Sequence, residues 1–294
     1  MTPHLVNRAL CVYRKQGLVT AIKKSLRFLP RYIRHLLGVK GLYGIDHYQR
    51  LLLWWNARPY ADSVDPFTVI DVDPTEIVHV TKRGPNPGRF QWQDIGRVQG
   101  GSWDRSDDRV EDLPVVRALR RRFEDGEEWE DIEFIQHILE QIEQGNVIWR
   151  GCSTEADVWE ACERVDELYE SIRDQGYLRQ RDLIEQNELS PDKYVTGDGF
   201  NRYDEVVVDI GRDGQFLFVD GRHRLAIARI LGLDRIPVRV SARHSAWQQV
   251  RLSLYNTDDG VPPRLQQHLD HPDVLDHPDV LELFENSRRN VEEL

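Results

Sequence analysis

Three features are scarce in this sequence of 294 residues: long apolar runs, cysteine and lysine. No apolar run reaches the roughly 18 residues of a membrane span, so the sequence predicts no spanning helix. The first residues also lack the apolar segment and cleavage site of a signal peptide, which predicts a cytoplasmic protein. The three cysteines (Cys11, Cys152 and Cys162) are too scattered for a disulfide framework and lack Cys-x-x-Cys spacing, so we expect buried thiols.

The scarcity of lysine restricts how the chain can bind phosphate. Only six lysines occur against 33 arginines, and Lys193 is the only lysine after Lys82. Phosphate binding in the second half must therefore rely on arginine, histidine or backbone groups, with Lys193 the sole lysine candidate. Such a composition, low in lysine and rich in acids, is typical of proteins from a salt-adapted cytoplasm.

Charge is divided unevenly along the chain. The net charge is −11, yet residues 1–50 hold ten basic residues against one acid, and the remainder holds 29 basic residues against 49 acids. The acidic remainder argues against broad contact with a nucleic-acid backbone. In the basic part, apolar residues recur at helical spacing from Leu18 to Leu36. This pattern predicts a basic amphipathic helical arm over residues 1–60.

Such an arm has three interpretations. Residues 1–40 suit an anionic membrane surface, which would place the protein peripherally at the inner face of the membrane. They also suit an acidic partner. The alternative is that the arm packs on the protein's own acidic body.

The remaining pattern predicts an α+β fold with a small mixed sheet. We expect one domain over residues 61–250 with a helical insertion at about 84–150, followed by a tail over 251–294. The expected strands are Phe67–Val80, with a turn at Asp73-Pro74, and a hairpin of Glu205–Ile210 with Gln215–Val219. The expected helices are Pro114–Phe123, Trp129–Glu143, a helix capped by Ser153 that ends before Gly176, a short helix at Leu178–Leu189, and a helix within Ser241–Tyr255.

Two further stretches carry open alternatives. Adjacent glycines precede Trp103 and Asp104, and they predict either a ligand-lining loop or a turn that holds the tryptophan. In the tail, Leu269–Val274 (LDHPDV) is repeated as Leu275–Val280. Aspartate before His-Pro favours caps of short, solvated helical turns. A metal site is the alternative, with ligands drawn from His268, His271, His277, Asp270, Asp273 and Asp276.

The most informative stretch is Val219–Val240, which predicts a strand, a tight turn, a buried helix and a second strand. Pro237 suggests that this second strand begins there or lies at an edge. The turn is Asp220-Gly-Arg-His-Arg224. Amides at a helix start, the positive end of the helix dipole and two arginines with a histidine together favour a phosphate.

Within this turn, each residue has an expected role. Gly221 lets a backbone approach, amides near Arg222 and His223 hold a terminal phosphate, and His223 and Arg224 add charge-assisted bonds. Asp220 binds Mg²⁺ or accepts a proton from an attacking hydroxyl. The alternative is that Asp220 caps the helix while the arginines pair with surface acids. Candidates for a second carboxylate are Asp104, Glu130, Asp131 and Asp209.

The second half resembles the ParB/sulfiredoxin-like superfamily. Phe67–Val80 is similar to its opening strand, Leu168–Gly176 to its helix-ending Ser-Ile and Gly pattern, and Phe216–Val240 to its signature strand, turn, helix and strand. The resemblance implies a nucleotide or phosphate site at the turn. Sulfiredoxins carry their nucleophilic cysteine where this chain has Arg222, so reductase chemistry is not expected.

Other branches of the superfamily narrow the function further. Partition proteins bind CTP at a Gly-Glu-Arg-Arg turn and carry a helix-turn-helix domain afterwards, and we find no such domain after Val240. A third branch phosphorylates free serine, and Asp220, Gly221, His223 and Arg224 match its turn.

The sequence therefore predicts a nucleotide-dependent phosphotransferase or nucleoside triphosphatase. ATP, ADP or CTP with Mg²⁺ would serve as cofactor, and the acceptor would be a small molecule or a membrane-associated precursor. A non-catalytic nucleotide-sensing or interaction module is the alternative. A nuclease or DNA-binding role conflicts with the acidic body.

Overall fold

The structure is a computed structural model that describes residues 69–84, 94, 96–185, 204–255 and 261–275. The basic arm, Cys11, Lys193 and residues 276–280 of the second LDHPDV copy lie outside these ranges, and the predictions made for them stay predictions. Within the described residues, no helix combines the length and apolar character needed to cross a bilayer.

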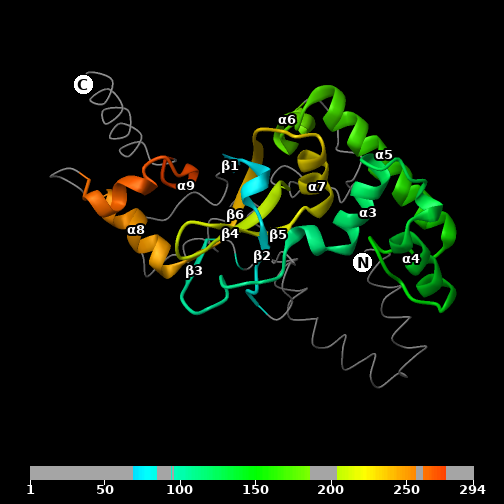
Figure 1. The fold of residues 1–294 in the computed structure, drawn as a ribbon, viewed down its shortest axis with the longest axis horizontal. Coiled ribbons are helices and arrows are strands. Elements are labelled where there is room, and N and C mark those ends of the chain that lie inside the picture. Colours follow the sequence, from blue (N-terminus) through cyan, green and yellow to red (C-terminus); the bar gives the residue numbers. More distant parts are fainter. Residues whose placement is uncertain (1–68, 85–93, 95, 186–203, 256–260, 276–294) are drawn as a thin grey trace, which may run out of the picture.

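A mixed sheet of six strands lies at the centre of the described residues, which confirms the α+β class (Figure 1). Its strand order is β1-β6-β4-β5-β2, and β3 pairs with β6 beyond this path. The strands are β1 (Val69–Val72), β2 (His79–Val80), β3 (Arg97–Gln99), β4 (Val206–Ile210), β5 (Phe216–Asp220) and β6 (Ile236–His244).

The predicted hairpin and the strand that follows it form the middle of the sheet. β4 and β5 pair antiparallel across the Gly211–Gly214 turn, as the Asp-Gly signal indicates. After helix α7 (Arg222–Ile230), β6 returns parallel to β4 on its other side. Pro237 is the second residue of β6 and faces Asp71 of β1, so the strand begins there but is not an edge.

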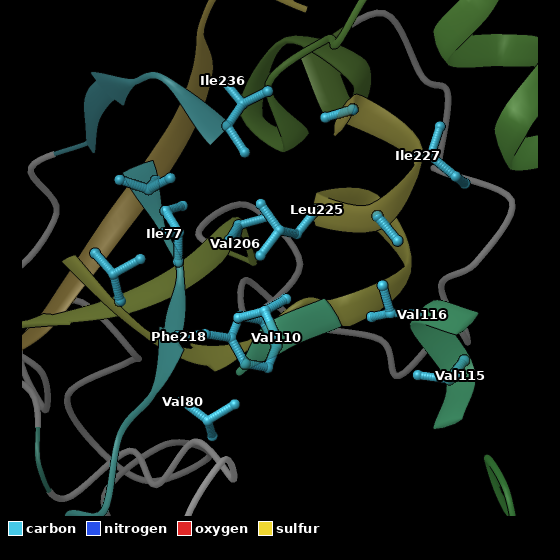
Figure 2. Close-up of a cluster of buried hydrophobic side chains, with 14 of the residues drawn as sticks. Ile77, Val80, Val110, Val115, Val116, Val206, Phe218, Leu225, Ile227 and Ile236 are labelled. Atoms are coloured by element: carbon cyan, nitrogen blue, oxygen red, sulfur yellow. The ribbon is translucent and has the colours of Figure 1, made fainter. Parts of the chain in front are cut away.

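The main core fills the space between this sheet and the helices. Val206 and Phe218 of the hairpin pack toward Leu225 of α7, and Val110 and Val116 belong to the same cluster (Figure 2). All five residues are buried. Burying such side chains contributes about 1.5–3 kcal/mol each, so this core fixes α7 against the sheet.

The helices predicted between residues 114 and 189 are present, with changes at their boundaries, whereas the stretch expected to be a helical insertion also contains strand β3. The elements are η3 (Val110–Asp112), α3 (Pro114–Phe123), η4 (Trp129–Asp131), α4 (Glu133–Glu143), α5 (Glu155–Gln175) and α6 (Gln180–Glu185). Thr154, not Ser153, is the N-cap of α5, because its side chain accepts the Asp157 amide while the Asp157 side chain accepts the Thr154 amide. Gly176 ends α5 as predicted. Cys152 and Cys162 are buried thiols, and burial raises their pKa values to about 11 and about 12.

The C-terminal part corrects two predictions. Arg243 and His244 belong to β6, and helix α8 (Ser245–Tyr255) begins only after them. The first LDHPDV copy is also not solvated: it forms the start of α9 (Pro272–Leu275), and Asp273 in it is fully buried. Figure 1 shows α8 and α9 together at the end of the molecule opposite α3–α5. In the described part of the chain, no group of three or more potential ligands could hold a metal ion.

His271 explains how this copy begins its helix. Its Nδ1 atom accepts the Asp273 amide at 3.1 Å, so Nε2 carries the proton and donates to the Gly214 carbonyl at 2.9 Å. The ring therefore caps α9 and ties it to the β4–β5 turn in its neutral form. The cap of this turn is therefore the histidine, and not the aspartate before it that the sequence had indicated.

Acid is expected to destabilise the fold through His271. Burial lowers the pKa of this imidazole below the usual 6.5. The unfolded chain therefore binds the proton more readily, and the stability from this group, complete above about pH 6.5, is lost as the pH falls toward the folded pKa. His271→Asn keeps an acceptor for the Asp273 amide but does not titrate. Its urea midpoint should fall less than that of the parent between about pH 7 and about pH 5.

The exposed His137 provides the matched control for this measurement. His137→Asn should leave the pH dependence of the urea midpoint unchanged. The same pH dependence in the parent chain and in a variant that carries His271→Asn together with His277→Asn, its equivalent in the second LDHPDV copy, would contradict the assignment.

Candidate functional site

The turn between β5 and α7 can be built only with glycine at position 221. Gly221 has φ +92° and ψ 31°, in the left-handed region that disfavours other residues. A Cβ atom there would also lie 2.9 Å from the Cα atom of Val206 on β4. The turn therefore lies directly against the neighbouring strand, and this packing by itself requires a glycine.

The start of α7 has no side-chain cap. The first helical bond runs from the Leu225 amide to the Gly221 carbonyl at 3.0 Å. The amides of a first helical turn lie outside the helix's own bonds and favour negative charge. Arg222 is exposed, and Asp220 is partly buried with its Oδ1 accepting the Gly221 amide at 2.8 Å. Asp220 thus stabilises the turn rather than the helix start.

Arg224 points away from an anion at this helix start. Its guanidinium is 3% exposed, donates to the Asp204 carbonyl, and lies 3.3 Å from the Asp204 carboxylate and 3.7 Å from Glu205. The hydroxyl of Tyr177 is 3.4 Å away. These contacts join α7 to the start of β4, so they favour a positioning role for Arg224 over a direct phosphate contact.

Glu205 is the acid at this turn that sequence reasoning missed. It is 2% exposed and accepts the Gln180 amide at 2.7 Å and the Tyr177 hydroxyl at 3.3 Å. Burial raises the pKa of its carboxyl, although Arg224 works in the other direction. The sequence did indicate the position of Glu205, because an antiparallel hairpin brings the residue that starts β4 next to the end of β5. The pairing of Val207 with Asp220 shows this proximity.

His223 lies under a neighbouring aromatic residue. It is partly buried, and its ring centroid is 6.3 Å from that of Trp149, which precedes α5. The insertion therefore contributes one wall beside the turn. This neighbour is not evident from the sequence, because Trp149 lies more than seventy residues earlier in the chain.

Asp104 lies at the other end of β5. It is 3% exposed and binds Arg212 of the β4–β5 turn through the Arg212 amide (3.0 Å) and guanidinium (2.7 and 2.8 Å). Burial opposes ionisation, but these hydrogen bonds outweigh it and lower the pKa of Asp104 to about 2. Trp103 donates to the Gln99 carbonyl at 3.3 Å. The glycine-rich stretch is thus the turn that holds a tryptophan.

Asp209 is a structural residue in a buried polar cluster. It is fully buried and accepts hydrogen bonds from the Arg83 guanidinium (2.8 and 3.1 Å), the Thr81 hydroxyl (2.9 Å) and the Ala242 amide (3.1 Å). Arg83 also binds Asp94 at 2.8 Å. Through these hydrogen bonds, Asp209 holds β4, β6 and the segment after β2 together.

The other two candidate carboxylates, Glu130 and Asp131, are exposed residues of η4. They are the first acids before α4, where negative charge complements the helix dipole. Of the five carboxylates considered, Asp220 is the one that lies within the turn itself. Mg²⁺ is commonly bound by one or two carboxylates together with substrate phosphates, so Asp220 suits a nucleotide-bound ion.

A cavity of about 320 Å³ lies at the other end of α7, near Arg229 and Ile230. Two of its arginines are already neutralised, Arg109 by Glu111 and Arg120 by Glu124. Arg229 donates to two backbone carbonyls, at 2.8 and 2.6 Å. This cavity is separate from the turn, since α7 lies between them.

Comparison of the chain with protein-family models, curated proteins and solved structures finds no match. The function is therefore argued from the turn itself. The resemblance to the ParB/sulfiredoxin-like superfamily stays a prediction that depends on the β5–α7–β6 unit.

Proposed function

We propose that the chain is a nucleotide-dependent phosphotransferase or nucleoside triphosphatase that binds a terminal phosphate at the start of α7. One observation carries the proposal: a turn restricted to glycine, at a helix start without a side-chain cap, lies between the carboxylate of Asp220 and the exposed guanidinium of Arg222. The acceptor would be a small molecule or a membrane-associated precursor. Helix starts of this kind bind phosphate through amides and the helix dipole.

The chemistry follows from the residues of the turn. The amides after Gly221 and the Arg222 guanidinium hold the terminal phosphate and offset its charge. Oδ2 of Asp220 either takes the proton of an attacking hydroxyl or binds Mg²⁺, which supplies charge neutralisation when bound. As the hydroxyl oxygen bonds to phosphorus, the bond to the bridging oxygen breaks and the nucleoside diphosphate leaves. Arg224 and Glu205 keep α7 in place.

At the level of fold, we propose a ParB/sulfiredoxin-like core. Support comes from the order of its parts: a hairpin strand, a turn with Asp, Gly, His and Arg, a buried helix, and a strand that returns beside the hairpin. The insertion between β3 and β4 would be an addition to that core.

A second candidate is a non-catalytic nucleotide-binding module. The observation that favours it is the commitment of Arg224 to Asp204 and Glu205, which leaves Arg222 as the arginine of the turn that faces solvent. A site with fewer charged groups aimed at the phosphate suits binding better than transfer.

Nucleotide binding and phosphate release test the proposal directly. The chain is titrated with ATP, ADP and CTP in the presence of Mg²⁺, and phosphate release or transfer is followed. We expect Arg222→Ala to weaken binding by at least about tenfold, because it removes a charge-assisted hydrogen bond. Asp220→Asn should retain binding and reduce turnover by at least about a hundredfold.

Arg117→Ala is the matched control, because this arginine is also exposed and pairs only with the exposed Asp112 among the contacts described. It should change neither measurement. Binding without turnover in the parent chain would support the non-catalytic module. Absence of binding to all three nucleotides would contradict the phosphate site.

A further inference from the structure

A second binding feature lies at the far end of the sheet from the turn between β5 and α7. Five residues form a socket there: Gly214 and Phe216 of the hairpin, Arg243 of β6, and Trp247 and Arg251 of α8. Trp247 is fully buried and Arg251 is 1% exposed. We call these five residues the C-terminal socket.

The socket binds the first LDHPDV copy mainly through Asp273. The Asp273 carboxylate accepts hydrogen bonds from Arg243 Nε at 2.9 Å and from Trp247 Nε1 at 2.8 Å. Arg251 Nε lies 3.2 Å from the same carboxylate and donates to the Asp273 carbonyl at 3.1 Å. Burial opposes ionisation, but the two guanidinium groups outweigh it and lower the pKa of Asp273 to about 2. The socket is therefore specific for an anionic residue at this position.

His271 makes the second set of contacts. Its ring stacks on Phe216 at 5.0 Å between centroids and lies 4.4 Å from Trp247, while Nε2 reaches the Gly214 carbonyl. Leu269 and Val274, the apolar residues at the two ends of the copy, are also buried. Asp270 is exposed, so the positions that the socket holds are the buried Leu269, Asp273 and Val274 and the half-buried His271.

The sequence supplies this peptide twice. Residues 269–275 read Leu-Asp-His-Pro-Asp-Val-Leu, and residues 275–281 read the same seven residues with Leu275 shared. Every buried group of the first copy has an identical counterpart six residues later: Leu275, His277, Asp279 and Val280. The second copy thus offers all the chemistry that the socket recognises.

We propose that the C-terminal socket is a binding site for this heptapeptide and that residues 275–281 are its second occupant. The chain then exchanges between two registers, with either Asp273 or Asp279 between the two arginines. The register in the structure keeps η6 (Pro263–His268) in place, with Leu265 buried and the His268 ring edge-on to Trp247 at 5.3 Å.

The second register gives up the contacts of η6 but little else. In it, Val274 takes the place of His268 before the heptapeptide, so the contact with Trp247 is lost. Lengthening the connection from α8 by six residues changes the closure equilibrium by only about twofold. The first register is therefore favoured, and the second becomes important when the first copy is damaged or held elsewhere.

Unfolding of full-length variants in urea tests this exchange. Asp273→Asn removes the charge of the first copy, and the second copy should then occupy the socket. Combining it with Asp279→Asn should raise the unfolding constant by at least a further tenfold, or about 1.4 kcal/mol. Asp279→Asn alone should leave stability unchanged, because the favoured register does not use it.

The matched control is Asp276→Asn combined with Asp273→Asn. It makes the same charge change in the same copy, but at the position equivalent to the exposed Asp270. Its stability in urea should therefore equal that of the Asp273→Asn variant alone. A further loss as large as that caused by Asp279→Asn would overturn the proposal, because it would indicate a general effect of charge.

Two other outcomes are decisive. If Asp273→Asn and the Asp273→Asn/Asp279→Asn pair are equally stable, or if Asp273→Asn alone fails to fold, the second copy does not replace the first. If only the pair fails to fold, the second copy sustains the single variant, as proposed. His271→Ala with and without His277→Ala repeats the comparison with milder changes.

Discussion

Replacing Asp209 with alanine is expected to lower the free energy of unfolding by about 3–5 kcal/mol. The reason is the guanidinium of Arg83, which is 5% exposed and would lose its two bonds to this carboxylate. The Thr81 hydroxyl and the Ala242 amide would lose an acceptor as well. Urea unfolding of the variant and the parent chain measures the effect.

Two comparisons separate this effect from a general loss of charge. Asp174→Ala removes an exposed carboxylate paired with Arg173 and should cost much less, because exposed ion pairs are screened by solvent. Changing Arg83→Met together with Asp209→Leu removes this buried pair, leaves Asp94 its contact with Arg97, and should cost less than Asp209→Ala alone. A cost for Asp209→Ala no larger than that for Asp174→Ala would refute the assigned role.

Gly221→Ala is expected to be the most damaging small change at the turn between β5 and α7. The left-handed φ costs about 1–2 kcal/mol for an alanine. The new Cβ would lie 2.9 Å from the Val206 Cα atom, a backbone contact that cannot relax by a rotamer change, which adds about 1–3 kcal/mol. Thermal or urea unfolding should show the sum of these two costs. The proposed nucleotide binding should weaken as well.

Comparison with Gly232, just after the other end of α7, separates the cost of the backbone conformation from the cost of the contact with Val206. Its φ is also positive, +65°, but nothing lies within 4 Å of a Cβ built there. Gly232→Ala should therefore show only the cost of the backbone conformation. Equal costs at the two positions would mean that the approach to Val206 is unimportant.

The hairpin, α7 and the returning strand could be predicted from sequence because each signal is local. The Asp-Gly turn, the alternation of β-branched residues and Gly221 before an apolar run require no knowledge of distant contacts. The same holds for helices α3 to α5, where α4 begins at Glu133 rather than Trp129 and the cap of α5 moved by one residue. Pro237 was ambiguous, since a proline that begins a strand and one at an edge look alike.

The partners of the charged residues could not be predicted in the same way. Arg83 meets Asp209 from 126 residues away, and Asp104 meets Arg212 across 108 residues. Nothing in the local sequence distinguishes these acids from solvated ones. Glu205 was within reach, because the predicted hairpin already placed the start of β4 beside Asp220. It was named as the first residue of the strand, but not among the candidate carboxylates.

The burial of Asp273 also decides where the smallest independently folding fragment ends. A fragment cut at residue 250, the domain boundary expected from the sequence pattern, would interrupt α8 and remove the carboxylate that neutralises Arg243. That guanidinium would then face the empty socket at the end of β6, the strand that joins β1, β3 and β4. Fragment design for expression or crystallisation should therefore extend through Leu275.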